Sequence, residues 1–307
     1  MANVVVTGGA GFIGSHIADM FISDGHKVDV IDDLSSGAEK NLNPKVIFHK
    51  LDIRSKEARE LLANLQPDIL VHAAAQMSVR NSMEDPAFDV SVNVFGIVNL
   101  LQAFLGKKQP YVVFLSTGGA IYGEQDAFPA TEDHKKQPSS VYGLSKHASE
   151  LYLEFWKREF NLKFAALRLG NVYGPRQNPH GEAGVIAIFY KKLFNGETPV
   201  INGSGAQTRD FVAVEDVARA VIAVAEKKVE GVFNIGTAKE TSVNDLYKVI
   251  VETAGVPAQA KYGEAKAGEQ MRSCIAVDKA KQVFGWQAKY DVHQGLKETA
   301  EWFRANK

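Results

Sequence analysis

Tyr142 and Lys146 are the two side chains of this 307-residue chain whose spacing best suits proton transfer. A separation of four residues places both on one face of a helix, one turn apart. Free tyrosine has a pKa near ~10, and a neighbouring ammonium group favours the phenolate and lowers that pKa. Tyr142 would then be a general base for a hydroxyl group. The alternative is an ordinary pair on a helix surface, because this spacing is common by chance.

The chain around this pair alternates between apolar strand-like runs and amphipathic helical runs. Such alternation predicts an α/β fold of the Rossmann type, with a doubly wound parallel sheet. We expect strands at 3–7, 27–31, 45–49, 68–73, 111–116 and 164–169, and helices at 12–24, 55–65, 87–107 and 140–160. The helix at 140–160 carries the Tyr–Lys pair directly after the strand at 111–116.

The first strand ends in Thr7-Gly8-Gly9-Ala10-Gly11-Phe12-Ile13-Gly14, a loop with three spaced glycines. Gly8 permits a tight turn, Gly11 lets the backbone approach a pyrophosphate, and Gly14 lets the following helix pack close to the strand. The helix N-terminus offers free N–H groups to phosphate oxygens. Strand, loop and helix follow in the order that dinucleotide binding requires, whereas an isolated three-glycine pattern could be an ordinary loop.

Asp32 and Asp33 end the second strand, about twenty residues after the glycines. An acidic side chain there accepts hydrogen bonds from the adenosine ribose and repels a 2′-phosphate. No Arg or Lys occurs in Leu34-Ser35-Ser36-Gly37. The pattern therefore favours NAD over NADP, and the alternative is a pair of solvated turn residues.

The alternation weakens after residue 170, which suggests two parts. Residues 1–170 form the expected NAD-binding domain, with a sheet completed by about 211–236, where strands at 211–214 and 232–235 flank a helix at 215–227. Residues 171–210 are rich in Gly, Pro and Asn, as expected for loops that build a ligand site. Residues 171–307 otherwise form a smaller substrate-binding lobe, with helices near 243–255 and 293–305.

Composition excludes several classes of protein. A net charge of −1 provides no general attraction for nucleic acid or an anionic membrane. We expect no signal peptide and no apolar run approaching the ~20 residues of a membrane span. The eight histidines show no metal-ligand spacing. Cys274 is the only cysteine, which excludes an internal disulfide and fits a cytoplasmic location.

Across essentially its whole length the chain resembles the extended short-chain dehydrogenase/reductase family, and within it the nucleotide-sugar 4-epimerases. The resemblance rests on an ordered set of motifs rather than on any one of them. These are TGGAGFIGSH at 7–16, DDLSSG at 32–37, Asp52-Ile53, HAAAQ at 72–76, Asn93, Ser116-Thr117 with Ile121-Tyr122-Gly123, Tyr142 with Lys146, Gly170-Asn171-Val172-Tyr173-Gly174-Pro175-Arg176, and Thr208-Arg209-Asp210-Phe211.

The resemblance implies a set of NAD-contacting residues. Asp52 and Ile53 would hold the adenine, and Lys146 would also bond the nicotinamide ribose. The remaining members would line the loops along the cofactor: Gly8, Gly11, Phe12, Ile13, Gly14, Asp32, Asp33, Leu34, Ser35, Ser36, Gly37, Ala73, Ala74, Ala75, Gln76, Asn93, Ser116 and Tyr142.

The resemblance also implies a UDP-hexose substrate, inverted at C4 of the sugar. Tyr142 would remove the 4-hydroxyl proton while a hydride passes to NAD, and the 4-keto sugar would turn over before the hydride returns. Asn171 and Arg209 would contact the diphosphate, for which a guanidinium is well suited. The alternative for Arg209 and Asp210 is a surface ion pair. Related enzymes dimerise through helices equivalent to 87–107 and 140–160, so a homodimer is expected.

The chain departs from the family pattern next to the reacting hydroxyl. A catalytic Ser or Thr is usual four residues before the Tyr-Gly pair, and here that position is Gly118. Thr117 is the natural substitute, although a water beside Gly118 is an alternative. Sugar-nucleotide dehydratases carry an Asp-Glu pair just after that Thr, where this chain has Gly119-Ala120. Dehydration would therefore lack its acid and base.

Further departures concern substrate choice. Asn202 stands where an aromatic often stacks on uracil, so the base is less certain. Arg272 is the candidate for a second diphosphate contact. Ser273 replaces a bulky tyrosine of some epimerases, which leaves room for a 2-acetamido group, as in UDP-GlcNAc and UDP-GalNAc. Other readings remain open: a UDP-glucuronate 4-epimerase, a sugar-nucleotide dehydrogenase or reductase, or a non-catalytic NAD-binding sensor.

Overall fold

A seven-stranded parallel sheet forms the centre of the computed structural model, which describes residues 1–179, 184–265 and 270–306. Its strand order is β11-β6-β5-β4-β1-β2-β3. The strands are β1 (Asn3–Thr7), β2 (Lys27–Asp32), β3 (Ile47–Lys50), β4 (Ile69–His72), β5 (Tyr111–Thr117), β6 (Lys163–Leu169) and β11 (Gly231–Ile235). The first six match the strands predicted from the sequence, and the predicted Rossmann-type α/β class is confirmed.

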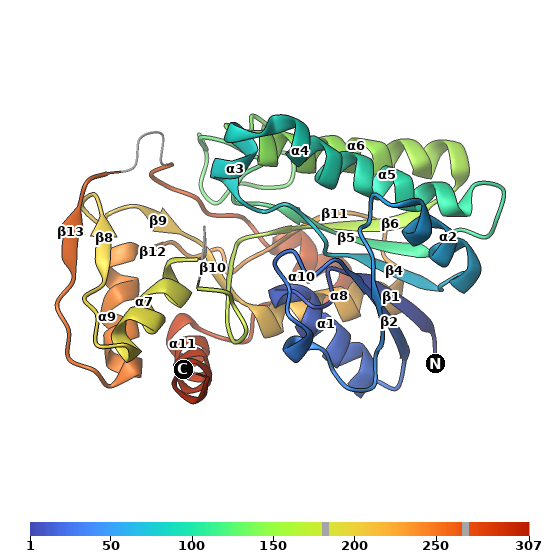
Figure 1. The fold of residues 1–307 in the computed structure, drawn as a ribbon. Helices are drawn as coiled ribbons and strands as arrows, with labels where there is room; N and C mark the ends of the chain where they lie inside the picture. Colours follow the sequence, from blue (N-terminus) through green and yellow to red (C-terminus); the bar gives the residue numbers. More distant parts are fainter. Residues whose placement is uncertain (180–183, 266–269, 307) are drawn as a thin grey trace.

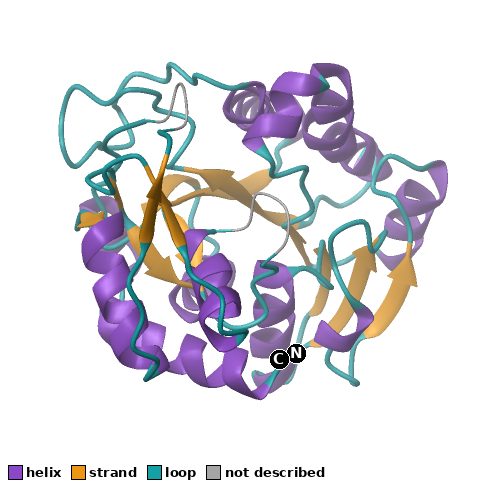
Figure 2. Cartoon of the chain, turned by 60° about the vertical axis from the view of Figure 1, so that its left-hand side comes forward, coloured by secondary structure: helices purple, strands orange, loops and turns teal. Residues whose placement is uncertain are grey.

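Helices cover both faces of the sheet, which is why its central strands are buried and mostly apolar (Figures 1 and 2). One face is covered by α1 (Phe12–Ser23), α8 (Val214–Lys227) and α10 (Asp278–Phe284), whose side chains share a core with β1 and β6. The other is covered by α2 (Lys56–Leu65), α5 (Gly96–Leu101) and α6 (Val141–Phe160). A short 3₁₀ turn, η1 (Glu39–Asn41), follows β2.

The prediction of one continuous helix at 87–107 is wrong in detail, because four shorter helical elements cover this part of the chain. After α3 (Val79–Glu84) come α4 (Pro86–Val90), a π-helical turn η2 (Ser91–Phe95), α5, and a 3₁₀ turn η3 (Gln102–Phe104). A π turn frees a backbone carbonyl from the regular ladder. Here the Asn93 carbonyl accepts a hydrogen bond of 2.8 Å from the Ser149 hydroxyl on α6.

By length and composition alone, Pro86–Phe104 could cross a membrane, with 19 residues and a mean hydropathy of 1.4, contrary to the sequence-based expectation. Half of the stretch is buried inside the protein. Its buried residue Asn99 is hydrogen-bonded inside the protein, where the side-chain amide donates to the Ile53 carbonyl at 2.8 Å. The stretch therefore serves as part of the helical layer over the sheet.

The chain beyond residue 170 builds a second, smaller layered region beside the sheet (Figure 1). Its paired strands are β7 (Asn171–Tyr173) with β10 (Phe211–Ala213), β8 (Val200–Asn202) with β13 (Lys261–Gly263), and β9 (Thr208–Arg209) with β12 (Thr241–Ser242). Its helices are α7 (Val185–Phe194), α9 (Val243–Ala254) and α11 (Val292–Ala305). Residues of these helices share one hydrophobic core with Tyr173 and Phe211.

Two expectations for this region are wrong. The strand predicted at 211–214 does not extend the main sheet, because β10 pairs with β7, and of the described residues after 170 only β11 enters that sheet. The segment 171–210 is not only loops, since it contains α7. Its apolar residues Ile186, Phe189 and Leu193 recur at helical spacing and are buried.

Candidate active site

The glycine loop between β1 and α1 is closely packed against the loop after β4. Gly8 has φ of 70°, and a side-chain carbon there would lie 2.6 Å from the Ala74 nitrogen. At Gly14 the added carbon would overlap the Gly8 carbonyl oxygen. At Gly11, by contrast, only that oxygen lies near, at 3.1 Å, and the other directions are open. The loop therefore leaves space for a ligand at Gly11, beside Phe12 and Ile13 in the first turn of α1.

Asp32, at the end of β2, fixes this loop from the side. Its buried carboxylate accepts hydrogen bonds from the Ala10 N–H at 3.0 Å and the Leu34 N–H at 2.8 Å. Burial raises the pKa of Asp32, and these two backbone donors oppose the rise. A carboxylate has about four lone-pair sites, so Asp32 can still accept from a ribose hydroxyl. The sequence did not reveal that Asp32 also holds the glycine loop in place by a hydrogen bond.

The rest of the predicted adenosine side lies on neighbouring strand ends. Asp33, Ser35 and Ser36 are exposed, and Gly37 packs closely against Ala10. Beyond β3, Asp52 is held by Arg54, whose Nη2 lies 2.6 Å from Oδ2. Ile53 is buried against Gly96.

The loop after β4 meets the π turn. The Gln76 N–H donates to Asn93 Oδ1 at 3.0 Å, and Asn93 Nδ2 donates back to the Gln76 carbonyl at 2.9 Å. Both side-chain amides also donate to Asp89, which is fully buried. Ala73, Ala74 and Ala75 are partly exposed along the same loop. Sequence reasoning found Gln76 and Asn93 but missed Asp89, which belongs to none of the motifs.

Tyr142 and Lys146 occupy the first turns of α6. The Ser140 hydroxyl caps this helix by accepting from the Gly143 N–H, and the Tyr142 N–H donates to Ser82 Oγ at 3.1 Å. Lys146 is buried, and its Nζ lies 4.2 Å from the centre of the Phe114 ring. Burial lowers the pKa of Lys146 to about 7, and the charges of Glu150 and Asp89 oppose the fall.

In the protein chain by itself the pKa of Tyr142 lies above its ordinary value, whereas the lowering expected from the sequence involves Lys146 together with a bound NAD. Burial raises the pKa of Tyr142 to about 12, the charge of Asp89 adds to the rise, and a hydrogen bond with the Thr117 side chain opposes it. The cause is desolvation of the phenolate. The ammonium group of Lys146 lies 4.2 Å from the centre of the Phe114 ring.

Thr117 lies at the end of β5, next to Gly118, the position where related enzymes usually have a catalytic Ser or Thr. Its hydroxyl bonds the Tyr142 phenol and accepts the Ala120 N–H at 3.1 Å. A side-chain carbon at Gly118 would lie 2.8 Å from Ile275 Cδ1, and the Gly118 N–H is already bonded to the Leu169 carbonyl. A serine or threonine would therefore not fit at 118 unless Ile275 moved.

Thr117→Val is expected to lower kcat about 10- to 100-fold, since a hydrogen bond to a developing charge is worth ~1.5–3 kcal/mol. The shape of the side chain is preserved, so the KM should change much less. The matched control is Thr299→Val, which removes another buried hydroxyl, on α11. Equal rates for both variants would contradict the role of Thr117.

Ser116 belongs to a buried polar network instead of presenting its hydroxyl to a ligand. Its Oγ donates to Glu150 Oε1 at 2.5 Å, and Glu150 also forms a buried ion pair with Arg168 at 2.6 Å. For the cofactor contact expected there, Ser116 retains its backbone groups and the acceptor side of its hydroxyl.

The predicted diphosphate contacts lie on the smaller region. Asn171 begins β7, close to Gly119, and Arg209 lies on β9. Asp210 is buried and accepts from the Thr237 N–H at 2.7 Å, so the alternative of a surface Arg209–Asp210 ion pair is wrong. Arg272 is exposed, stacks at 3.8 Å over Phe128, and donates twice to Glu240.

The extended segment around Ser273 joins both regions of the protein. On one side the segment is bonded to Thr208 of β9. The Thr208 N–H donates to the Met271 carbonyl at 2.9 Å, and the Ser273 N–H donates to the Thr208 carbonyl at 3.2 Å. On the other side, the Ala130 N–H donates to Cys274 at 2.9 Å, and the Ala276 N–H donates to Ala130 at 2.8 Å. Ser273 itself is buried.

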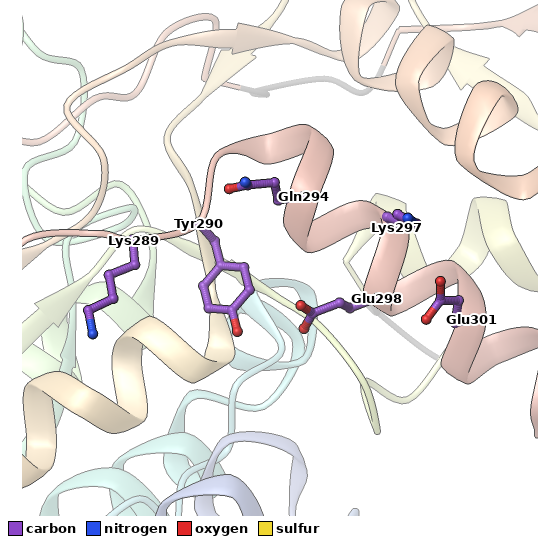
Figure 3. Close-up of a pocket in the computed structure, with 6 residues that line it drawn as sticks. All are labelled: Lys289, Tyr290, Gln294, Lys297, Glu298 and Glu301. Carbon is purple, nitrogen blue, oxygen red and sulfur yellow. The ribbon is translucent and has the colours of Figure 1, made fainter.

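A surface pocket at the start of α11 is separate from these candidates (Figure 3). Its lining residues are Lys289, Tyr290, Gln294, Lys297, Glu298 and Glu301. None of them is a residue that the sequence predicted for the site.

A doubly wound parallel sheet, a glycine turn open at Gly11 and a Tyr–Lys pair with a buried lysine define a dinucleotide-dependent enzyme of the Rossmann type. Comparison with known proteins specifies the class further. The family model of the NAD-dependent epimerase/dehydratase family matches residues 4–236, and the chain belongs to that family.

Individual relatives cover almost the whole chain. The UDP-glucose 4-epimerase of Mycolicibacterium smegmatis is 41% identical over 306 residues, 98% of each chain. A solved UDP-glucose 4-epimerase with UDP-glucose from Thermotoga maritima is 43% identical, with a TM-score of 0.95 over 99% of each chain. A UDP-N-acetylglucosamine 4-epimerase from Methanobrevibacter ruminantium is 35% identical, with a TM-score of 0.94 over 100% of this chain and 99% of that one.

NAD is the cofactor of this family, and the residues of the chain fit it. The open side of Gly11 suits the pyrophosphate, and the Asp32 carboxylate suits the adenosine ribose and disfavours a 2′-phosphate. When bound, NAD would supply a group that accepts a hydride from the substrate and can give the same hydride back.

Proposed function

We propose that this protein is a UDP-glucose 4-epimerase, which interconverts UDP-glucose and UDP-galactose. The observation that carries the proposal is the end-to-end match to the Thermotoga maritima enzyme, combined with the intact arrangement of Thr117, Tyr142 and Lys146. A non-catalytic sensor would have no need of this set of groups. A dehydratase lacks support because Gly119 and Ala120 carry no acid or base.

Each residue has a part in this reaction. Tyr142 removes the proton from the sugar 4-hydroxyl, Thr117 holds that oxygen, and Lys146 bonds the nicotinamide ribose. Inversion follows when the 4-keto sugar presents its other face to the returning hydride. Asn171, Arg209 and Arg272 hold the diphosphate, so that only the sugar turns.

We assign residues 1–170, α8, β11 and α10 to the NAD-binding domain, and the other elements after residue 170 to the sugar-nucleotide-binding lobe. The separate hydrophobic core of the second part supports this division. The lone cysteine fits a cytoplasmic enzyme.

The test is incubation of the purified protein with UDP-glucose and no added cofactor. Epimerase activity is expected to produce UDP-galactose without net accumulation of NADH. Net NADH formation on adding NAD would instead show a dehydrogenase, and the absence of both products would contradict the proposed function.

UDP-GlcNAc and UDP-GalNAc are proposed as additional substrates, because a small residue, Ser273, replaces a bulky tyrosine. The likeness to the Methanobrevibacter ruminantium enzyme supports this proposal. The same coupled assay on the acetamido pair checks it, and no turnover of that pair would rule it out.

We further propose a homodimer that pairs the outer faces of α3, α4, η2 and α6, which lie together in Figure 1. These faces expose Val79, Met83, Phe88, Val90, Phe95, Leu144, Leu151, Tyr152, Phe155 and Phe160. Large exposed apolar side chains on neighbouring elements support a protein interface there. A second copy of the chain would cover it with the same face.

Leu151→Glu is expected to convert the dimer to a monomer, because a charge in an apolar interface is left unpaired. Light scattering at several concentrations measures the mass. A wild-type protein that is monomeric throughout would contradict the proposed dimer, as would an unchanged mass for the variant.

A further inference from the structure

Glu240, in the loop between β11 and β12, is a carboxylate to which the reaction proposed above assigns no part. Both of its oxygens accept hydrogen bonds from Arg272, Oε1 from Nε at 2.9 Å and Oε2 from Nη2 at 2.6 Å. Two parallel bonds of this kind fix both the position and the plane of a guanidinium group. The Thr208 hydroxyl also donates to Oε1. Glu240 therefore connects Arg272 to Thr208, the residue directly before Arg209.

The loop that carries Glu240 is held in place by Asp210. This buried carboxylate accepts hydrogen bonds from the N–H and the hydroxyl of Thr237, at 2.7 and 2.6 Å, and from the Ala238 N–H at 3.1 Å. Ala238 lies at φ of 57°, a conformation that is costly for a residue with a side chain and persists only where surrounding contacts impose it. The loop therefore has a buried anchor two residues before Glu240.

The Arg272 guanidinium is also stacked on an aromatic ring. Its Cζ lies 3.8 Å from the centre of the Phe128 ring, in the loop between β5 and α6. A planar guanidinium can stack on an aromatic face while the N–H groups at its edge form hydrogen bonds. The backbone on both sides of Arg272 is bonded to Thr208 as described above. Arg272 is thus fixed at its backbone, at one face of its guanidinium and along one edge.

Arg272 keeps hydrogen-bond donors for a ligand despite these contacts. A guanidinium has five N–H donors. Glu240 takes one on Nε and one on Nη2, and Nη1 makes no hydrogen bond to any residue that the structure describes. The side chain remains 53% exposed. The free edge of the guanidinium can therefore still donate to the oxygens of a phosphate group.

We propose that Glu240 is a positioning residue, which fixes the Arg272 guanidinium for contact with the diphosphate before the nucleotide sugar binds. The inference rests on the proposed function for the diphosphate contact of Arg272. Immobilising a long side chain during binding costs roughly 2- to 10-fold in affinity. An arginine that is already fixed in the free protein avoids most of this cost.

The charge of Glu240 acts in the opposite direction and is the weaker effect. A carboxylate beside a phosphate site repels the anion, but Glu240 is exposed and paired with a guanidinium. Interactions between exposed charges are small and are screened by salt. Loss of the carboxylate should therefore weaken diphosphate binding while Arg272 is present. Without Arg272, the same loss should leave binding unchanged or strengthen it slightly.

Glu240→Gln breaks the paired bonds with little change in shape. The amide has one oxygen to accept from Arg272, and its NH₂ group would face a second donor. The control is Glu252→Gln on α9, which removes an exposed carboxylate of the same region, paired with His293 at 3.1 Å. Arg272→Ala and the double variant Glu240→Gln/Arg272→Ala complete a double-mutant cycle.

The first measurement is the dissociation constant of UDP by calorimetry, on the full chain as purified. Glu240→Gln is expected to weaken UDP binding about 3- to 10-fold in the wild-type background and not at all in the Arg272→Ala background. Glu252→Gln should bind UDP as wild type does. An unchanged UDP affinity in Glu240→Gln, or an equal loss in both backgrounds, would overturn the inference and leave the proposed function intact.

The second measurement separates KM from kcat for UDP-glucose. In Glu240→Gln the KM should rise by the same factor as the dissociation constant of UDP, with kcat unchanged, because the diphosphate is held equally in the ground state and the transition state. A lower kcat at unchanged KM would indicate a structural defect and overturn the inference. A wild type that binds UDP but forms no UDP-galactose would refute the proposed function alone, because the calorimetric cycle does not depend on turnover.

Discussion

Tyr142→Phe is expected to lower kcat about 10²- to 10⁴-fold, the usual contribution of a positioned general base. The variant removes only the oxygen that bonds Thr117 and keeps the aromatic ring in the first turn of α6. Binding of NAD and UDP should therefore remain nearly intact. The measurement is kcat by a coupled epimerase assay, together with the dissociation constant of UDP by calorimetry.

The matched control for this variant is Tyr152→Phe, which removes an exposed phenol from the same helix. Its kcat is expected to equal that of wild type. A Tyr142→Phe enzyme with unchanged kcat would show that another group is the base. Because burial raises the pKa of Tyr142, the wild-type rate should rise with pH until the phenol of the loaded enzyme is ionised.

Gly14→Ala is expected to abolish retention of NAD and to lower the Tm. The added carbon would overlap the carbonyl oxygen of Gly8, which is backbone and cannot rotate away. The turn would have to open, and the N–H groups of α1 would lose their position toward the pyrophosphate. Cofactor content after gel filtration and a thermal melt measure the two effects.

Gly25→Asn is the control for this second variant. Gly25 also lies in a loop, at φ of 81°, but a side-chain carbon there would meet nothing within 4 Å. Asparagine tolerates this left-handed conformation better than most residues. Cofactor content should be unchanged in the control. A Gly14→Ala protein that keeps its NAD would contradict the assigned geometry of the loop.

Local patterns predicted the elements that carry the site. Gly8 and Gly11 lie in the loop after β1, Gly14 lies in the first turn of α1, and Tyr142 and Lys146 lie on the helix expected for them. Strand bounds were predictable because buried parallel strands are continuous apolar runs. The π turn was not predicted, and the bond that its Asn93 carbonyl accepts comes from Ser149, a residue of another helix.

The remaining failures have a common cause in contacts between distant segments. Ile275 fills the space at Gly118, and it lies more than 150 residues away in the chain. The pKa of Tyr142 depends on burial and on Asp89, neither of which the spacing of Tyr142 and Lys146 reveals. β10 has the pattern of a core strand but pairs with β7, because a short apolar strand does not specify its neighbour.

The segment 271–276 has a mechanical consequence. Its backbone is bonded to Thr208 on one side and to Ala130 on the other, so it connects β9, which carries the proposed diphosphate contact Arg209, to the loop between β5 and α6. Moving the two regions apart would break these bonds together. In the proposed reaction the two regions therefore keep a fixed distance from each other, and the sugar rotates about its bond to the diphosphate.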